Sequence, residues 1–531
     1  GTAASDTGKG IQVSSSATLG DYDLSAESYL AIAANQTLAG QLNLQSNGEL
    51  NISGDGGYTG GIALAGGKLN AVDDLTLAGT VSISASSEII VPTDSTLVLN
   101  QTGGLSLGAN TLTLSGGGNF QSVGLDLNDE DSKLLLNSIT VDSVSTSADS
   151  SGLDVDADST VTSLTVGHTT PVSIDTGKIL SGAITVTAGS IKLAETGTLA
   201  SSIAMSGGVL EADNSLTVSG TLTHTGNITI DVAVNKTLTY SGAAISLGAN
   251  TLTLRGAGSL VSGGLTLNDA SSKLLVDSMT VDSVSTSVDN SLGLHVRNGN
   301  PTISSLLVSN ILPVQIDGGR RLSGAITVTN NGTLKLIEGF NGTGTLASSI
   351  SMSGGALEAD NSLTVSGTLT HTGNITIDVA ETKTLTYTGT AISLGANTVT
   401  LSGGGSLVSG GLTLNDADSK LLLNSITVDS VSTSVDNSLG LDVDADSTVS
   451  SLSVANITPV AIADGSSLSG AITVTAGSIK LAETGTLASS ISMSGGVLDA
   501  DNSLTVSGTL TQSGNITIDV ADTKTLTYSG A

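Results

Sequence analysis

The chain has 531 residues and a formal net charge of −31, from 47 acidic and 16 basic residues. This charge excludes nucleic acid as a partner, because a phosphate backbone requires a surface rich in Lys and Arg. The absence of cysteine excludes a disulfide framework and a thiolate metal site. No run of about 18 apolar residues occurs, so the sequence predicts no membrane span.

The composition predicts a narrow, repetitive core. Glycine supplies 67 residues and proline 5, so turns are frequent and glycine makes most of them. Aromatic residues make up 2% of the chain, and tryptophan is absent. Because aromatic side chains supply much of the volume of a globular core, we expect Leu, Ile, Val and Ala to fill this one.

Long internal repeats decide the fold class. The segment 181–203 recurs without change at 469–491, and such self-similarity is typical of arrays that grow in one dimension. The Leu of each LSG motif, and of one degraded LAG motif, marks the start of a copy. The chain thus divides into an atypical N-terminal segment (1–37), repeat one (38–179), repeat two (180–321), repeat three (322–467) and a partial repeat four (468–531).

A finer period of roughly twenty residues runs through each repeat, within the lengths expected of solenoids. Stretches such as 228–230 and 251–254 alternate apolar and polar residues, which is the pattern of strands with one buried face. The sequence therefore predicts an all-β parallel β-helix, or β-solenoid, with about seven turns in each repeat of about 142 residues. At about 4.8 Å per turn, some 26 turns would stack to a length on the order of 120 Å.

Two tracts carry a resemblance to known proteins: SLGANTLTLSGGG at 106–118 and ITVTAGSIKLAETGTL at 184–199. They resemble the β-helical stalks of filamentous-haemagglutinin-like and autotransporter-passenger adhesins. The resemblance covers most of the chain, as a style of repeat. It implies a right-handed β-helix, bacterial export and surface display, and it brings no catalytic residues.

A tract of alternating aspartates in repeat one returns in repeat three. On a strand such side chains share one face, and their hard oxygen ligands suit Ca²⁺. The tract resembles the first half of an EF-hand loop but lacks the Gly and the Glu that complete it. We interpret it as a solvated acidic face, with calcium as the one cofactor candidate. The residues are Asp154, Asp156, Asp158, Asp442, Asp444 and Asp446.

Repeat two departs from this pattern. It replaces the aspartate tract with His295–Asn300 (HVRNGN), so Ca²⁺ cannot be a structural requirement of every repeat. All four arginines also lie in repeat two, and without tryptophan the chain lacks the stacking platforms of a sugar-cleaving groove. We therefore expect no enzyme, although a polysaccharide-binding or polysaccharide-cleaving β-helix is an alternative. The arginines are Arg255, Arg297, Arg320 and Arg321.

The four histidines and the Thr-x-Thr pairs suggest no site. His168, His224, His295 and His371 are interpreted as surface or turn residues. Outward Thr arrays would suit an ice-binding module, a further alternative together with a calcium-binding one. However, the pairs fall at uneven spacing, and we expect them to lie on different faces.

Repeat three carries one insertion, at 337–343 (IEGFNGT), which lengthens a turn and contains Phe340. Arg320 and Arg321 come shortly before it. Drift in a tolerant loop is one interpretation. The other is a binding loop formed by Arg320, Arg321 and Phe340. In either case we predict that Phe340 is exposed on a protruding loop.

The ends of the array suggest self-association. Residues 1–37 could cap the first turn, and the absence of an initiator Met at Gly1 is interpreted as a sign of a processed product or of an excised segment. The chain stops at 529–531, whereas the equivalent 241–243 continues into further turns. An open end exposes unpaired backbone groups and apolar side chains. Two explanations follow: the chain was cut from a longer array, or its open end stacks on the first turns of another copy. We expect head-to-tail association of copies.

Near-identical repeats favour a function that scales with length, because a catalytic site is needed only once. The sequence predicts a secreted structural protein at the cell surface or outside the cell. Its expected role is the stalk of an adhesin or the subunit of a surface filament, with a host or cell-surface molecule as a candidate ligand.

Overall fold

The computed structural model describes residues 10–340, 342 and 344–530. These residues form 68 β-strands and no helix, so none of them makes a helix able to cross a bilayer. They divide into two compact bodies. The N-terminal body comprises 10–245 and 250–263, and the C-terminal body comprises 246–249 and 264–530. Residues 1–9 of the predicted cap lie outside the described part.

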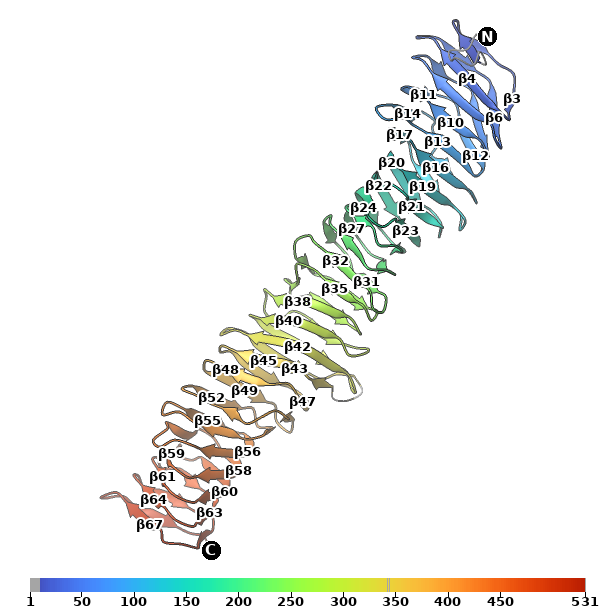
Figure 1. Cartoon of the computed structure of the whole chain (residues 1–531). Helices are drawn as coiled ribbons and strands as arrows, with labels where there is room; N and C mark the ends of the chain where they lie inside the picture. The colour runs from blue at the N-terminus through green and yellow to red at the C-terminus, as the bar shows by residue number, and fades with distance from the viewer. Residues whose placement is uncertain (1–9, 341, 343, 531) are drawn as a thin grey trace. The chain divides into compact units, whose positions relative to one another are not determined.

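Each body is built on a long sheet of thirteen parallel strands, in which every strand lies beside the one from the preceding turn (Figure 1). In the N-terminal body these are β1 (Gly10–Val13), β4 (Glu27–Ile32), β7 (Glu49–Ser53), β10 (Lys68–Ala71), β13 (Ser87–Ile90), β16 (Thr111–Ser115), β19 (Lys133–Asn137), β21 (Gly152–Val155), β23 (Thr170–Ile174), β25 (Ser190–Leu193), β28 (Val209–Ala212), β31 (Ile228–Val232) and β34 (Thr251–Arg255).

The C-terminal body repeats this arrangement. Its strands are β37 (Lys273–Val276), β39 (Gly293–Val296), β41 (Ile311–Ile316), β43 (Thr333–Ile337), β46 (Ala356–Ala359), β49 (Ile375–Val379), β52 (Thr398–Ser402), β55 (Lys420–Asn424), β57 (Gly440–Val443), β59 (Ile457–Ile462), β61 (Ser478–Leu481), β64 (Val497–Ala500) and β67 (Thr517–Val520). The described chain is therefore a parallel β-solenoid of about 26 turns of roughly 20 residues, and this prediction is confirmed.

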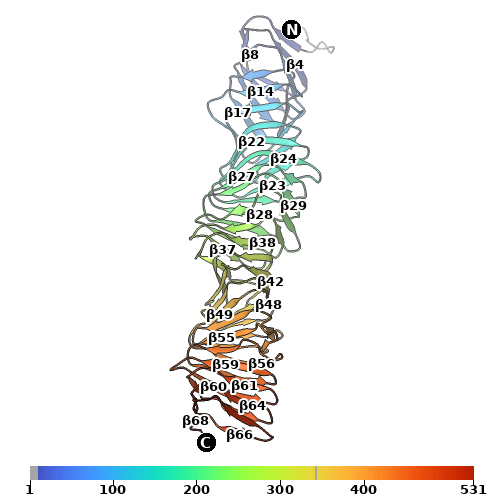
Figure 2. The same ribbon diagram turned by 90° about the vertical axis from the view of Figure 1, so that its left-hand side faces the viewer.

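Each turn leaves the long sheet, crosses the other side of the solenoid and returns (Figure 2). After β16, for example, the chain forms β17 (Asn119–Ser122) and β18 (Leu125–Leu127) before it re-enters the long sheet at β19. On the next turn one longer strand, β20 (Thr140–Thr146), pairs in parallel with both β17 and β18. We use the word corner for a point where the chain leaves the long sheet or the strands on the other side of the solenoid.

The core consists of apolar ladders that run from turn to turn. Leu112, Leu134, Leu153 and Val172 are direct partners in the successive strands β16, β19, β21 and β23, and all four are buried. The alternation in the sequence produces these ladders, because every second side chain of a strand points inward. Burying one such side chain contributes about 1.5–3 kcal/mol, so each added turn stabilises its neighbours.

The interior also contains aromatic side chains, which the prediction of a purely aliphatic core missed. Tyr58 and Phe120 are among the largest fully buried side chains. Tyr58 donates a hydrogen bond from its hydroxyl to Gly40 O at 2.9 Å, and burial raises the pKa of this phenol to about 12. An aromatic ring fits here because its one polar atom reaches a backbone carbonyl.

A buried serine ties successive turns together. The hydroxyl of Ser132 donates to the carbonyl oxygen of Gly108, one turn earlier, at 2.6 Å and accepts the N–H of Asp129 at 3.0 Å. The same pair of bonds recurs at Ser272 and at Ser419. The repeats therefore preserve turn hydrogen bonding as well as the apolar ladders.

Candidate functional site

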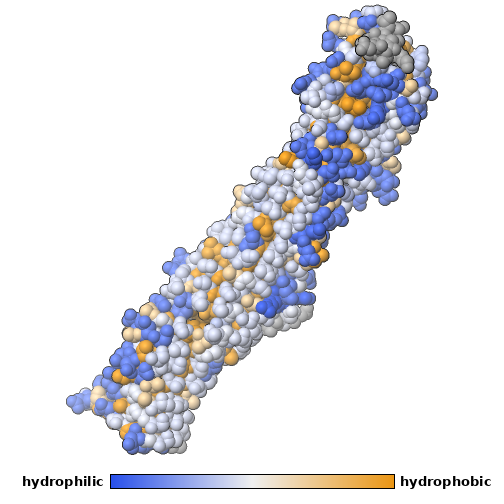
Figure 3. Space-filling view, viewed as in Figure 1, coloured by the Kyte–Doolittle hydropathy of each residue, from blue (hydrophilic) through white to orange (hydrophobic). Residues whose placement is uncertain are grey.

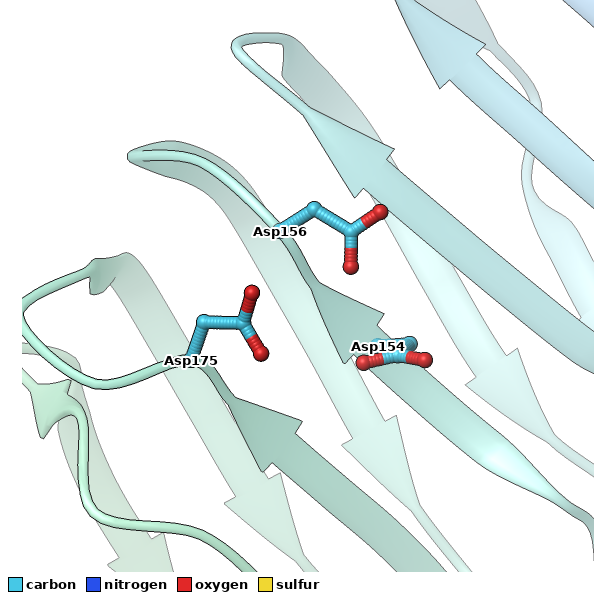
Figure 4. Close-up of side chains that lie close together, drawn as sticks. All are labelled: Asp154, Asp156 and Asp175. Carbon is cyan, nitrogen blue, oxygen red and sulfur yellow. The ribbon is translucent and has the colours of Figure 1, made fainter.

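Three carboxylates meet at one corner of the N-terminal body (Figure 4). Asp154 lies in β21, Asp156 follows that strand, and Asp175 follows β23 on the next turn. Each offers one oxygen, and these three oxygens lie within 4.8 Å of one another. We call this group the acidic corner. Its ligand atoms are those that Ca²⁺ prefers.

The charges at the acidic corner are only partly balanced. Lys133 Nζ lies 2.7 Å from Asp154 Oδ2, and both side chains are partly exposed. Partial burial, followed by repulsion from Asp154 and Asp175, raises the pKa of Asp156 above its ordinary value. At this corner the charge of Asp154 is balanced by Lys133, whereas Asp156 and Asp175 repel each other. Binding of a proton or a cation would relieve that repulsion.

The third aspartate of the predicted tract lies elsewhere. Strand β21 ends at Val155, so the backbone turns before Asp158. The prediction that the three side chains share one strand face is therefore wrong. Asp158 Oδ1 instead accepts the backbone N–H of Ile179 at 3.0 Å. Asp175, which no sequence pattern singled out, is the third member of the cluster in place of Asp158.

Repeat three has a reduced version of the same corner. Lys420 Nζ lies 2.7 Å from Asp442 Oδ2, as Lys133 does from Asp154. Val443 pairs with Ile462, so the residue that follows, Ala463, occupies the place of Asp175. Asp446 accepts the backbone N–H of Ser467 at 2.8 Å. With Ala463 in this place, the corner in repeat three lacks the third carboxylate.

Repeat two replaces the acidic corner with a buried His–Asp pair, in the C-terminal body. His295 Nε2 lies 2.9 Å from Asp317 Oδ1, and the two residues are 4% and 8% exposed. The expectation that all four histidines are surface or turn residues is therefore wrong for His295. The hydrogen bond to Asp317 offsets the free-energy cost of burying His295, because each side chain satisfies a polar atom of the other.

The same carboxylate also binds the backbone at Phe340, within the insertion of repeat three. The backbone N–H of Phe340 donates to Asp317 Oδ1 at 2.9 Å, and the N–H of Gly318 donates to the carbonyl oxygen of Phe340 at 2.9 Å. The centroids of the Phe340 and His295 rings are 5.9 Å apart, with 35° between the planes. Phe340 is nevertheless 65% exposed, which confirms the predicted exposure. Residues 341 and 343 of the insertion lie outside the described residues.

Arg320 and Arg321 lie on the turn beside this loop. The N–H of Arg320 donates to Asp317 O at 2.9 Å and closes the turn, while the N–H of Thr345 donates to Arg320 O at 2.8 Å. Arg321 begins β42 (Arg321–Val328) and pairs with Thr345 in β44 (Thr345–Leu346). Both arginines are exposed. Among the described residues, neither guanidinium makes an ion pair within 4.0 Å.

The remaining sequence candidates are not brought together. His224 and His371 are partly buried, and each ring lies 3.1 Å from a nearby carbonyl oxygen, that of Gly226 or Gly373. The pair Thr237/Thr239 lies in β32 (Thr237–Tyr240), outside the long sheet that contains Thr251 and Thr253 of β34. These pairs lie on different faces, as predicted.

No known protein family, curated protein or solved structure matches this chain. The fold and the two kinds of corner are therefore the basis for any functional proposal.

Proposed function

We propose that the chain is a secreted, structural β-solenoid, without catalytic activity, that serves as the stalk of a bacterial surface adhesin or as the subunit of a surface filament. The observation that carries the proposal is the regularity of the turns: near-identical sequence, the same ladders and the same turn hydrogen bonds recur along each body. A function that depends on length benefits from each added turn.

The repeat length supports growth by whole units. Seven strands of the long sheets fall within each of the three repeats defined by the sequence, for example β7 to β23 within 38–179 and β43 to β59 within 322–467. A unit of seven turns can be added or removed without changing the partners of any remaining strand. We propose this unit as the step in which the array varies in length, wound in the right-handed sense that the resemblance implies.

The surface fits a spacer. On the face shown in Figure 3, residues of intermediate hydropathy cover most of the area, with scattered hydrophilic and hydrophobic residues between them. Such a surface follows from the many Ser, Thr and Gly residues and the 12% of charged residues. It gives few sites for tight binding along the array, so specific contacts would be confined to the corners and the ends.

The last described turn supports end-to-end stacking. Ile518, Val520 and Tyr528 are exposed, whereas the equivalent Ile377, Val379 and Tyr387 are buried by the next turn. An exposed strand edge with apolar side chains recruits further strands. We propose that further turns cover it, either those of a longer array or the first turns of a second copy.

Deletion of one repeat tests the structural role. Removing 322–467 joins Arg321 to Leu468 in the register of the intact chain. We expect a folded protein whose length in electron micrographs falls by about 34 Å, from seven turns of about 4.8 Å. Removing 322–331, about half a turn, is the control and should disrupt folding locally. If the 322–467 deletion lost cooperative unfolding or kept its full length, the proposal would be wrong.

A further inference from the structure

The corner around Phe340 differs from its counterparts on successive turns. His295 stands where repeats one and three have aspartate, and the exposed Arg320 and Arg321 stand where repeat one has Lys178 and Ile179. The insertion at 337–343 follows on the next turn. The first and the last of these changes meet in space, because Asp317 forms hydrogen bonds with both His295 and Phe340, and Arg320 closes the turn that begins at Asp317. Drift in a loop would not couple changes on three turns.

This corner holds an exposed aromatic ring in a fixed position. Two hydrogen bonds fix the backbone of Phe340, one to the buried carboxylate of Asp317 and one from Gly318. The ring lies near that of His295 and remains 65% exposed. Because its backbone is already ordered, the ring loses little conformational entropy when a ligand packs against it.

The same corner presents two exposed arginines in a chain of net charge −31. Arg255 pairs with Asp231 and Arg297 lies near Asp277, but Arg320 and Arg321 have no ion-pair partner among the described residues. A guanidinium group binds a carboxylate or a sulfate through two parallel N–H···O bonds. Acidic side chains are abundant in this chain, so two consecutive, exposed arginines without an ion-pair partner among the described residues are available to a ligand.

We infer that Phe340, Arg320 and Arg321 form a binding site for an acidic saccharide. The flat apolar face of a pyranose ring packs on the Phe340 ring, and the arginines bind the carboxylate or sulfate of the sugar. His295 and Asp317 are positioning residues, because they are buried and hold the backbone of Phe340. Glu338, exposed on the same loop, repels an anion and favours ligands whose charge lies toward the arginines. This inference goes beyond the structural role, and its failure would leave that role unaffected.

The test measures binding of the full chain to three immobilised polymers at physiological salt, where long-range repulsion is screened. Polygalacturonate presents carboxylates, dextran sulfate presents sulfates, and dextran is neutral. The variants are Phe340→Ala, and Arg320→Gln with Arg321→Gln. Val123→Ala, at the same 65% exposure, and Arg255→Gln are the matched controls. Thermal unfolding verifies that each variant folds.

We expect binding to at least one acidic polymer and none to dextran, and the polymer that binds identifies the anionic group. The double arginine variant should lose about tenfold or more in affinity, and Phe340→Ala about fivefold, while both controls stay within about twofold. Glu338→Gln should tighten binding. The inference is overturned by equal binding to dextran, by equal losses in Arg255→Gln and the double variant, or by binding to neither acidic polymer.

Discussion

The carboxylate of Asp317 accepts a hydrogen bond from the ring of His295 at 2.9 Å, at the place where repeat one sets Asp175 against Asp154. In repeat one the two side chains are both acidic and partly exposed, and Asp154 pairs with Lys133 instead. In repeat two, one replacement makes the pair complementary, and both side chains are buried. The buried carboxylate can then accept the N–H of Phe340 and fix the backbone at that residue.

Asp317→Ala should destabilise the C-terminal body by about 1–3 kcal/mol, because it leaves the buried ring of His295 and the N–H of Phe340 without their acceptor. Urea unfolding measures the loss. Asp175→Ala is the matched control and should cost little, since it removes a partly exposed carboxylate that is repelled by its neighbours. Equal losses in the two variants would show that Asp317 is not a buried acceptor.

Asp156→Asn should stabilise the protein at neutral pH, by about 1 kcal/mol or less at this exposed position. The folded-state pKa of Asp156 is raised above its ordinary 3.8, so the stability linked to its protonation is present below that value and lost as the pH rises through the folded pKa. The neutral amide removes this loss. Thermal unfolding at pH 7 should therefore show the gain, and at pH 3 the two proteins should unfold alike.

Calcium gives a separate test of the acidic corner. If its carboxylates form only a solvated face, EDTA should leave the melting temperature of the native chain nearly unchanged, and added Ca²⁺ should not raise it. A site that binds Ca²⁺ stabilises the folded state in proportion to the logarithm of ion concentration. A fall of many degrees in EDTA, abolished in Asp156→Asn, would show that the corner binds a structural ion.

Ser419→Ala should cost about 1–3 kcal/mol, because it leaves the N–H of Asp416 and the carbonyl of Gly395 without their buried partner. In urea unfolding we expect a lower midpoint concentration, while the dependence of the unfolding free energy on urea concentration stays unchanged. Ser453→Ala, on an exposed position of β58 (Ser447–Val454), should change stability by no more than about 0.5 kcal/mol. If the two variants behaved alike, the turn bond would not contribute to stability.

The sequence was enough to predict the solenoid but not its corners. Alternation at positions such as 251–254 fixes which side chains face the core, and that pattern is local. Contacts at a corner join residues one turn apart, and the spacing varies: Asp154 and Asp175 are 21 residues apart, whereas Leu134 and Leu153 are 19 apart. An average period of about twenty cannot decide which of several candidates meet. Asp175 and the pair of His295 with Asp317 were missed for this reason.

End-to-end association should increase with protein concentration and with salt. The exposed Ile518, Val520 and Tyr528 favour contact with another copy, while a net charge of −31 on each chain opposes it. At 0.1 M salt, repulsion between charges more than about 10 Å apart is largely screened, whereas the apolar contact is left intact. Sedimentation velocity at rising salt measures the shift to larger species. Val520→Lys should weaken association, because it places a charge on the exposed strand edge, and Val123→Lys, on an exposed turn, should not. Monomers alone at high protein and high salt would exclude stacking and leave an unpolymerised stalk.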